Sequence, residues 1–196
     1  VIEYIDDIDI SAKKIGAVNT IVNTNGFLKG YNTDFYGAKR ALEKSSLKEK
    51  KIIMIGAGGV AKAIGLAVID LGGELTIINR DDQKALKLSS KLKCKTKKYT
   101  DLDQIQGYGF INATSVGMND DKKMIINNNH LNNFETIMDV VIYPSETKLI
   151  KSARLMKKNI ISGSLMCVYQ AAEQFRLYTG KNVPNQLITN TIIKYR

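Results

Sequence analysis

Lys51-Ile52-Ile53-Met54-Ile55-Gly56-Ala57-Gly58-Gly59-Val60-Ala61 is the stretch that decides the fold of this chain. Its continuous apolar run at 52–55 predicts a parallel strand that is buried on both faces. The glycines follow at once and open a helical segment at 58–71, which stops at Gly72-Gly73. A strand, a glycine turn and a helix in this order predict the first unit of an α/β sheet.

The spacing G-x-G-x-x-A in this turn is typical of sites that receive the pyrophosphate of a dinucleotide. In such a site Gly56 makes the tight turn, Gly58 lets the pyrophosphate approach the backbone, and Ala61 allows close packing of helix on strand. The free amides at the helix start face the phosphates, and the helix dipole adds roughly 0.3–1 kcal/mol. The alternative is a glycine turn without a ligand. Candidate cofactor-binding residues here are Gly56, Ala57, Gly58, Gly59, Val60 and Ala61.

Strands and helices continue to alternate after this unit. Further strands are expected at 74–78, 110–111, 137–141 and 159–161, with helices at 82–92 and 146–157. This alternation predicts a Rossmann-type, doubly wound parallel sheet of the α/β class.

The segment before the alternating part has a different pattern. Asn25-Gly26 separates two strand-like runs at 18–22 and 27–31, and Asn-Gly tolerates the positive φ angles of a tight hairpin turn. The following segment, 34–44, has helical spacing, and Asp34 is a candidate N-cap for it.

The end of the second strand indicates which dinucleotide binds. An NAD site usually has an acidic residue there, whereas this chain has Asn79-Arg80. A guanidinium can hold a 2′-phosphate through paired hydrogen bonds of about 1.5–3 kcal/mol each, and Lys84 is a candidate second cation. Asp81 and Asp82 follow directly and weaken the positive field around Arg80. The alternative interpretation of Arg80 is an exposed arginine at a strand end that binds no ligand. The residues favour NADP.

Composition excludes several other classes. The chain has 196 residues with 44% hydrophobic and 24% charged content, and it has no apolar run of the roughly 20 residues that span a bilayer. Its net charge of +10 comes from lysines mixed with polar residues and few aromatics, which favours a solvated face over a nucleic-acid surface. Cys94, Cys167 and His130 lie far apart, so we expect no metal site and a reducing, cytoplasmic location.

Four further motifs resemble those of the shikimate/quinate dehydrogenase family, in the family's order and at suitable spacings. They are Gly16-Ala-Val-Asn-Thr20, Gly30-Tyr-Asn-Thr-Asp34, Asn112-Ala-Thr-Ser-Val-Gly-Met118 and the segment from Gly163 to Gln170. The similarity runs from about residue 15 to the end of the chain.

The resemblance implies an NADP-dependent reduction of 3-dehydroshikimate to shikimate, a step toward chorismate and the aromatic amino acids. It implies that Asn19, Asn32, Asp34 and Gln170 contact the substrate, and that Asp34 pairs with a lysine as a catalytic dyad. It also implies that Thr114, Ser115, Val116 and Gly163 line the cofactor. Hydride transfer at a ring carbon needs a partner for the hydroxyl proton, and amide side chains suit a polyhydroxylated ring because they both donate and accept.

The resemblance further implies three parts. Residues 1–33 are expected to be the end of an α/β substrate-binding domain, 34–163 the NADP-binding domain, and 164–196 two helices that return to the substrate domain. Monomer and homodimer both stay open.

Some family features are missing from the sequence. No residue matches the family's lysine, which precedes the Gly16 segment by a few tens of residues, so we expect an incomplete, inactive fragment. Ile142 stands where the family usually has tyrosine, and Leu165 where it often has glycine. A quinate dehydrogenase that uses NAD and a non-catalytic nucleotide-binding module are the alternatives.

Overall fold

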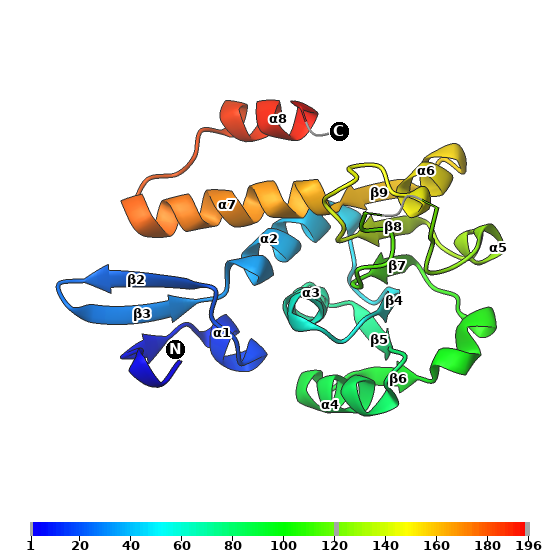
Figure 1. The fold of residues 1–196 in the computed structure, drawn as a ribbon, viewed down its shortest axis with the longest axis horizontal. Helices are drawn as coiled ribbons and strands as arrows, with labels where there is room; N and C mark the ends of the chain where they lie inside the picture. Colours follow the sequence, from blue (N-terminus) through cyan, green and yellow to red (C-terminus); the bar gives the residue numbers. More distant parts are fainter. Residues whose placement is uncertain (1, 120–121, 195–196) are drawn as a thin grey trace.

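A computed structural model describes residues 2–119 and 122–194, and the larger of its two sheets is fully parallel (Figure 1). Its strands are β4 (Lys51–Ile55), β5 (Glu74–Ile78), β6 (Lys95–Lys97), β7 (Gly109–Asn112), β8 (Thr136–Asp139) and β9 (Asn159–Ser162). They lie in the order β6-β5-β4-β7-β8-β9. Numbered from β4, this is 3-2-1-4-5-6, the strand order of a doubly wound dinucleotide-binding sheet.

Helices cover both faces of this sheet. Ile52 and Met54 of β4 point into a core formed with α3 (Gly59–Asp70) and α4 (Asp82–Leu92). Ile53 and Ile55 point to the opposite face, which is covered by η3 (Tyr99–Gln104), α5 (Asn128–Leu131) and α6 (Lys148–Leu155). Burial on both faces explains why β4 is apolar without interruption.

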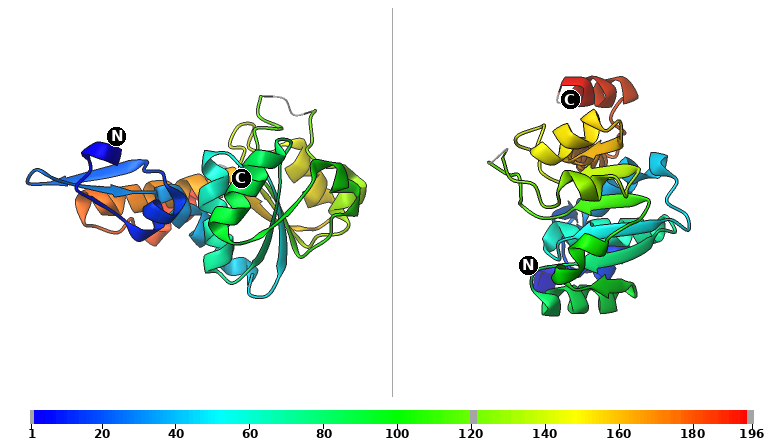
Figure 2. Two further views of the ribbon diagram at one scale, coloured as in Figure 1. Left: turned by 90° about the horizontal axis from the view of Figure 1, so that it is seen from below. Right: turned by 90° about the vertical axis from the view of Figure 1, so that its right-hand side faces the viewer.

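The second sheet is small and lies at the other end of the molecule, as Figure 2 shows. It contains β1 (Asp7–Ile8), β2 (Thr20–Thr24) and β3 (Phe27–Tyr31) in the order β1-β3-β2. Asn25 and Gly26 in the β2–β3 turn have φ angles of 52° and 92°, which is the positive-φ pair that the Asn-Gly signal predicts. The 3-10 turn η1 (Ile2–Tyr4) and helix α1 (Ile10–Ile15) complete this end.

Two helices connect the two ends. Helix α2 (Thr33–Leu42), followed by the 3-10 turn η2 (Glu43–Ser45), packs along α7 (Gly163–Thr179), and α8 (Asn185–Lys194) lies beyond α7 (Figure 1). A Cβ on Gly37 would stand 2.7 Å from the Met166 carbonyl oxygen, so α2 and α7 approach as closely as their backbones allow. Lys91 of α4 adds a bridge by donating to the Ile15 carbonyl of α1 at 2.8 Å.

The structure confirms the α/β class, the doubly wound sheet and the hairpin. The expected cap of α2 is wrong: Asn32 caps this helix by accepting from the Phe35 amide, and Asp34 lies inside the first turn. Helix α6 is shorter than expected, because Thr147 caps it. Strands β1 and β6 and helix α1 had no predicted counterpart. The three expected domain boundaries stay a prediction.

Gly56 gives the first test, because its φ is 125° and a Cβ there would lie 2.5 Å from the Ala113 carbonyl oxygen. We expect Gly56→Ala to lower the free energy of unfolding by about 1–3 kcal/mol or more, measured by urea denaturation. Gly58→Ala is the matched control, since Gly58 has a φ of −81° and a Cβ there meets no atom within 4 Å. Equal losses for the two variants would refute this account of the turn.

Candidate functional site

The carboxyl ends of β4 and β7 form the point where the sheet's connections change direction. These two strands are neighbours, and their ends are tied by the Ala113 amide, which donates to the Ile55 carbonyl at 2.8 Å. Open α/β sheets bind ligands in the crevice at this switch point. Gly56 and Ala113 therefore lie where a dinucleotide site is expected.

The start of α3 is exposed at this switch point. Gly58 is the N-cap residue and offers no side chain to the first amides of the helix. Gly58 and Gly59 are exposed, and a Cβ built on either meets nothing within 4 Å. The uncapped amides and the helix dipole make this a fitting place for a phosphate group.

Arg80 lies directly after β5 on the same edge of the sheet. Its side chain is exposed, and within residues 2–119 and 122–194 it forms no ion pair. The neighbouring Asp81 is engaged instead: it caps α4 at the Lys84 amide, and its carboxylate lies 3.7 Å from the Lys84 ammonium. Asn79 donates to the Asp81 carbonyl at 3.0 Å. Among the described residues, the guanidinium of Arg80 is therefore available to bind an anion, whereas the ammonium of Lys84 is paired with the carboxylate of Asp81.

A buried polar network shapes the loop that follows β7. The Asn112 side chain accepts from the Thr114 amide and hydroxyl at 3.1 and 2.7 Å, and donates to the Val116 carbonyl at 3.1 Å. It also donates to the Asp139 carboxylate at 2.9 Å. Burial raises the pKa of Asp139, and hydrogen bonds from Thr147, Val141 and Asn112 oppose that rise. Ser115 is exposed beside this network.

Gly163 has a packing role in the structure. A Cβ there would lie 2.4 Å from the Val140 carbonyl oxygen, so only glycine lets α7 begin against the end of β8. The expected cofactor contact of Gly163 stays a prediction.

The expected substrate residues gather where β3 runs into α2, around Thr33. The Asn19 side-chain oxygen accepts from the Thr33 amide at 2.8 Å and from its hydroxyl at 3.0 Å. From α7, Gln170 donates to the same hydroxyl at 2.9 Å. Segments separated by 137 positions thus meet at one buried threonine.

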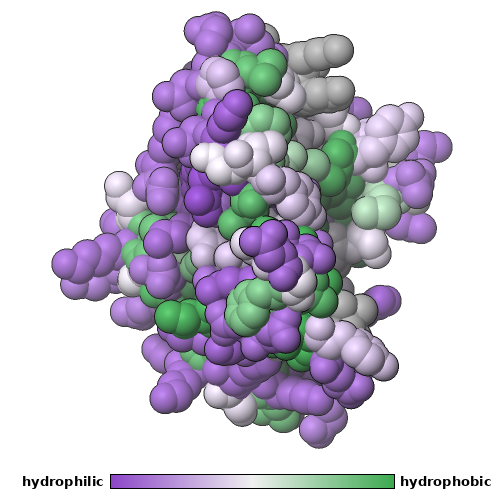
Figure 3. Space-filling model, turned by 90° about the vertical axis from the view of Figure 1, so that its left-hand side faces the viewer, coloured by the Kyte–Doolittle hydropathy of each residue, from purple (hydrophilic) through white to green (hydrophobic). Residues whose placement is uncertain are grey.

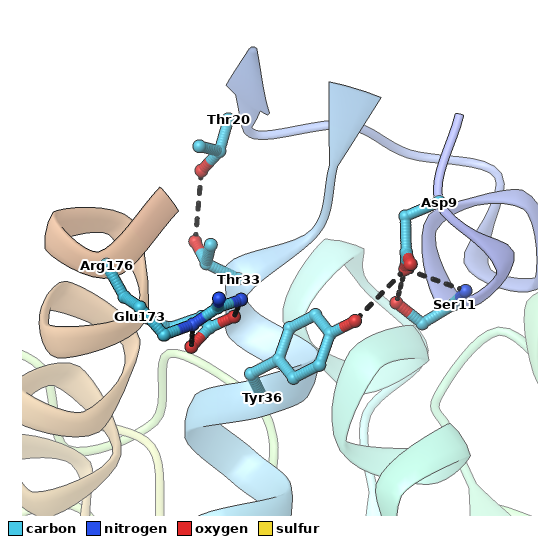
Figure 4. A network of polar contacts seen from close by, with 7 residues as sticks. All are labelled: Asp9, Ser11, Thr20, Thr33, Tyr36, Glu173 and Arg176. Atoms are coloured by element: carbon cyan, nitrogen blue, oxygen red, sulfur yellow. Dashed lines mark hydrogen bonds and ion pairs between the residues drawn. The ribbon is translucent and has the colours of Figure 1, made fainter. Parts of the chain in front are cut away.

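Further side chains extend this cluster (Figure 4). The Thr20 and Thr33 hydroxyl oxygens lie 3.1 Å apart, and Gln174 donates to Thr20 at 3.0 Å. Thr20, Thr33 and Gln174 were missed as site residues, although the first two lie inside the motifs quoted for Asn19 and Asp34. Figure 4 also shows Tyr36 pointing away from the cluster toward Asp9, to which its hydroxyl donates at 3.3 Å.

Asn32 and Asp34 differ in how their side chains are used. Asn32 is 4% exposed, accepts from the Phe35 amide and donates to the Ala17 carbonyl, so its polar atoms serve the backbone. Its substrate contact stays a prediction without support from this geometry. Asp34 is half-buried; burial raises the pKa of its carboxyl, and a hydrogen bond from Asn19 opposes the rise.

The remaining surfaces of the molecule include an apolar groove and a mixed polar and apolar face. An apolar groove of about 840 Å³ lies between α7, α8 and the segment at 142–145. On the face with the hairpin and α1, hydrophobic side chains are scattered among hydrophilic ones (Figure 3). Within the described ranges, no group of three or more His, Cys, Asp or Glu side chains could hold a metal ion. No helix in the same ranges is long and apolar enough to cross a bilayer.

An uncapped glycine turn at the switch point of a doubly wound sheet is typical of dinucleotide-binding proteins. The chain also holds a cluster of amides and hydroxyls around Thr33. Residues 37–142 match the family model "Shikimate / quinate 5-dehydrogenase". A shikimate dehydrogenase (NADP(+)) of Dehalococcoides mccartyi is 39% identical in an alignment of 201 positions, which covers 96% of this chain and 70% of the relative. The chain belongs to the shikimate/quinate dehydrogenase family of oxidoreductases.

Solved structures show the same similarity. A shikimate 5-dehydrogenase from Thermus thermophilus, in complex with NADP(H) and shikimate, has a TM-score of 0.86 and 26% identity over 100% of this chain and 74% of its own. A quinate dehydrogenase from Corynebacterium glutamicum, in complex with NAD, has a TM-score of 0.90 and 28% identity over 99% of this chain and 73% of its own.

The raised pKa of Asp34 gives a second test. The carboxyl of Asp34 has its ordinary pKa of 3.8 in the unfolded protein and a higher pKa in the folded protein. Its stabilising contribution to the folded protein is therefore fully present below the unfolded pKa and is lost as the pH rises through the folded pKa. We therefore expect Asp34→Asn to gain stability relative to the wild type between pH 3 and pH 7, measured by urea denaturation. Asp82→Asn, at an exposed position in the first turn of α4, is the control and should not gain. A wild-type advantage that grows with pH would contradict the assigned burial of Asp34.

Proposed function

We propose that this chain carries the NADP-binding site and part of the substrate site of an enzyme that reduces 3-dehydroshikimate to shikimate, toward chorismate and the aromatic amino acids. The observation that carries the proposal is the open glycine turn together with Arg80 at the end of the neighbouring strand, which forms no ion pair with the described residues 2–119 and 122–194. The NADP(+) in the relatives' names and the NADP(H) and shikimate bound to the Thermus structure support it.

The proposed cofactor site has three parts. The main-chain amides of 58–61 receive the pyrophosphate, because they have no side-chain cap. Arg80 binds the 2′-phosphate, since a guanidinium can form paired hydrogen bonds with phosphate oxygens. The loop at 114–116 lines the nicotinamide end. When bound, the cofactor supplies the hydride.

The proposed substrate site is the cluster around Thr33. Asn19 and Gln170 orient ring hydroxyl groups, and Thr33 holds both amides in place. Asp34 lies beside Thr33 and holds the group that exchanges the hydroxyl proton. We assign no residue of this chain to that proton-transferring role, so cofactor binding is a sharper test of the proposal than turnover.

The alternatives are weighed by two observations. A quinate dehydrogenase that uses NAD, like the similar protein from Corynebacterium glutamicum, needs no cation for a 2′-phosphate, and the free Arg80 counts against it. A non-catalytic nucleotide-binding module needs no substrate site, and the convergence of Asn19, Asp34 and Gln170 counts against that. We further propose a cytoplasmic location for the enzyme.

Arg80 provides the test of cofactor choice. We expect this chain to bind NADP more tightly than NAD. Arg80→Ala should remove most of that difference by weakening the binding of NADP about 10–100-fold, because it removes charged hydrogen bonds of about 1.5–3 kcal/mol. Calorimetric titration of both dinucleotides measures it. Lys84→Ala is the control and should cost less, because its ammonium already faces Asp81. Equal affinities of the wild type for NADP and NAD would sink the assignment.

A further inference from the structure

Asp139, the last residue of β8, is a fully buried carboxylate that the proposed chemistry does not use. It is 0% exposed and lies opposite Asn112, since β8 is the neighbour of β7. Three donors surround it: the Asn112 amide group at 2.9 Å, the Val141 amide at 3.1 Å and the Thr147 hydroxyl at 2.6 Å. Its Oδ1 accepts two of these bonds, from Asn112 and from Val141, so the oxygen that faces Asn112 acts only as an acceptor.

This acceptor role determines the orientation of Asn112. The side chain of Asn112 is 1% exposed and has an oxygen at one end and an NH₂ group at the other. Because this oxygen of Asp139 only accepts, the NH₂ group must face it. A flipped amide would set its oxygen against the carboxylate and its NH₂ group against the Thr114 amide, and it would lose both contacts.

The fixed amide then shapes the loop. With its oxygen turned away from Asp139, Asn112 accepts from the Thr114 amide and hydroxyl, while its NH₂ group also donates to the Val116 carbonyl. The Thr114 hydroxyl oxygen in turn accepts from the Val116 amide at 3.1 Å. The loop backbone at 114–116 is therefore bonded, step by step, to a carboxylate on another strand.

We propose that Asp139 is a positioning residue for the cofactor: its carboxylate fixes the amide of Asn112 and thereby holds the loop at 114–116 in the form that receives the nicotinamide end. This inference rests on the proposed function, which places that loop beside the nicotinamide. Asp139 does not touch the cofactor. Its effect is confined to the half of the site beside β7, while the glycine turn and Arg80 hold the adenosine half without it.

A purely structural role is the competing explanation, because Asp139 also ties β8 to α6. Thr147 caps α6 through the Ile150 amide and donates to Asp139. Thr147→Val removes these bonds and leaves Asn112 bonded to Asp139. It is therefore the matched control for loss of the α6 contact alone.

The experiment compares two ligands on the full chain. NADPH requires both halves of the site, whereas 2′,5′-ADP carries only the adenosine half with its 2′-phosphate. We expect Asp139→Leu to raise the Kd of NADPH about tenfold or more, which is the scale of one or two lost hydrogen bonds. The Kd of 2′,5′-ADP should change less than about twofold. Asp139→Asn, which can still accept from Asn112, should recover most of the NADPH affinity. Thr147→Val should lower the free energy of unfolding without a selective loss of NADPH.

The outcomes separate this inference from the proposed function. If the wild type binds neither ligand, the proposed function falls and the inference falls with it. If the wild type binds both, a folded Asp139→Leu that loses the two ligands in parallel, or loses neither, overturns the inference alone. Should Asp139→Leu not fold, Asn112→Ser takes its place, because serine is too short to join Asp139 to the loop. It should show the same selective loss of NADPH, and unchanged NADPH binding by Asn112→Ser also overturns the inference.

Discussion

The close approach of the chain at Gly56 to the chain at Ala113 is the constraint on which the rest of the structure depends. Gly56 has no space for a side chain, and its φ of 125° lets β4 turn into α3 within a few residues. The turn places the uncapped amides of α3 at the carboxyl ends of β4 and β7. A bulkier residue would push these two strand ends apart and would move the helix start away from the place where a pyrophosphate fits.

A second constraint joins the small sheet to the large one. Helix α2 emerges from the small sheet and packs on α7, with Gly37 set against the Met166 carbonyl. This contact brings Gln170 to Thr33, and Asn19 reaches the same threonine from the chain just before β2. The polar cluster is thus a product of backbone packing between distant segments, and its geometry depends on glycine as much as on the polar residues themselves.

The sequence allowed most of the sheet to be predicted, because β4 and β5 are apolar and the glycine turn has a distinctive spacing. It did not reveal β6, in which Lys95 and Lys97 point outward and only Thr96 packs inward, a pattern common to edge strands and also to loops. The sequence does not decide which residue caps α2, because Asp and Asn are both good caps and Asn32 and Asp34 lie two positions apart. Here Asn32 takes that role.

The candidate site was predicted less completely than the fold. Motifs predicted Asn19, Asn32, Asp34 and Gln170, and their substrate contacts stay a prediction. The hydrogen bonds of Thr33 and Gln174 form only because α2, β2 and α7 meet. The link from Asp139 to the loop after β7 likewise joins two neighbouring strands and leaves no periodic signal in the sequence. Contacts of this kind follow from the tertiary arrangement, so they required the structure.

The measurement that tests the central claim most directly is an NMR titration of the ¹⁵N-labelled chain with NADP. The account predicts that the largest shifts occur at the backbone amides of Gly58, Gly59 and Val60 and at the guanidinium of Arg80. Shifts confined to the apolar groove between α7 and α8, with the glycine turn unchanged, would contradict it.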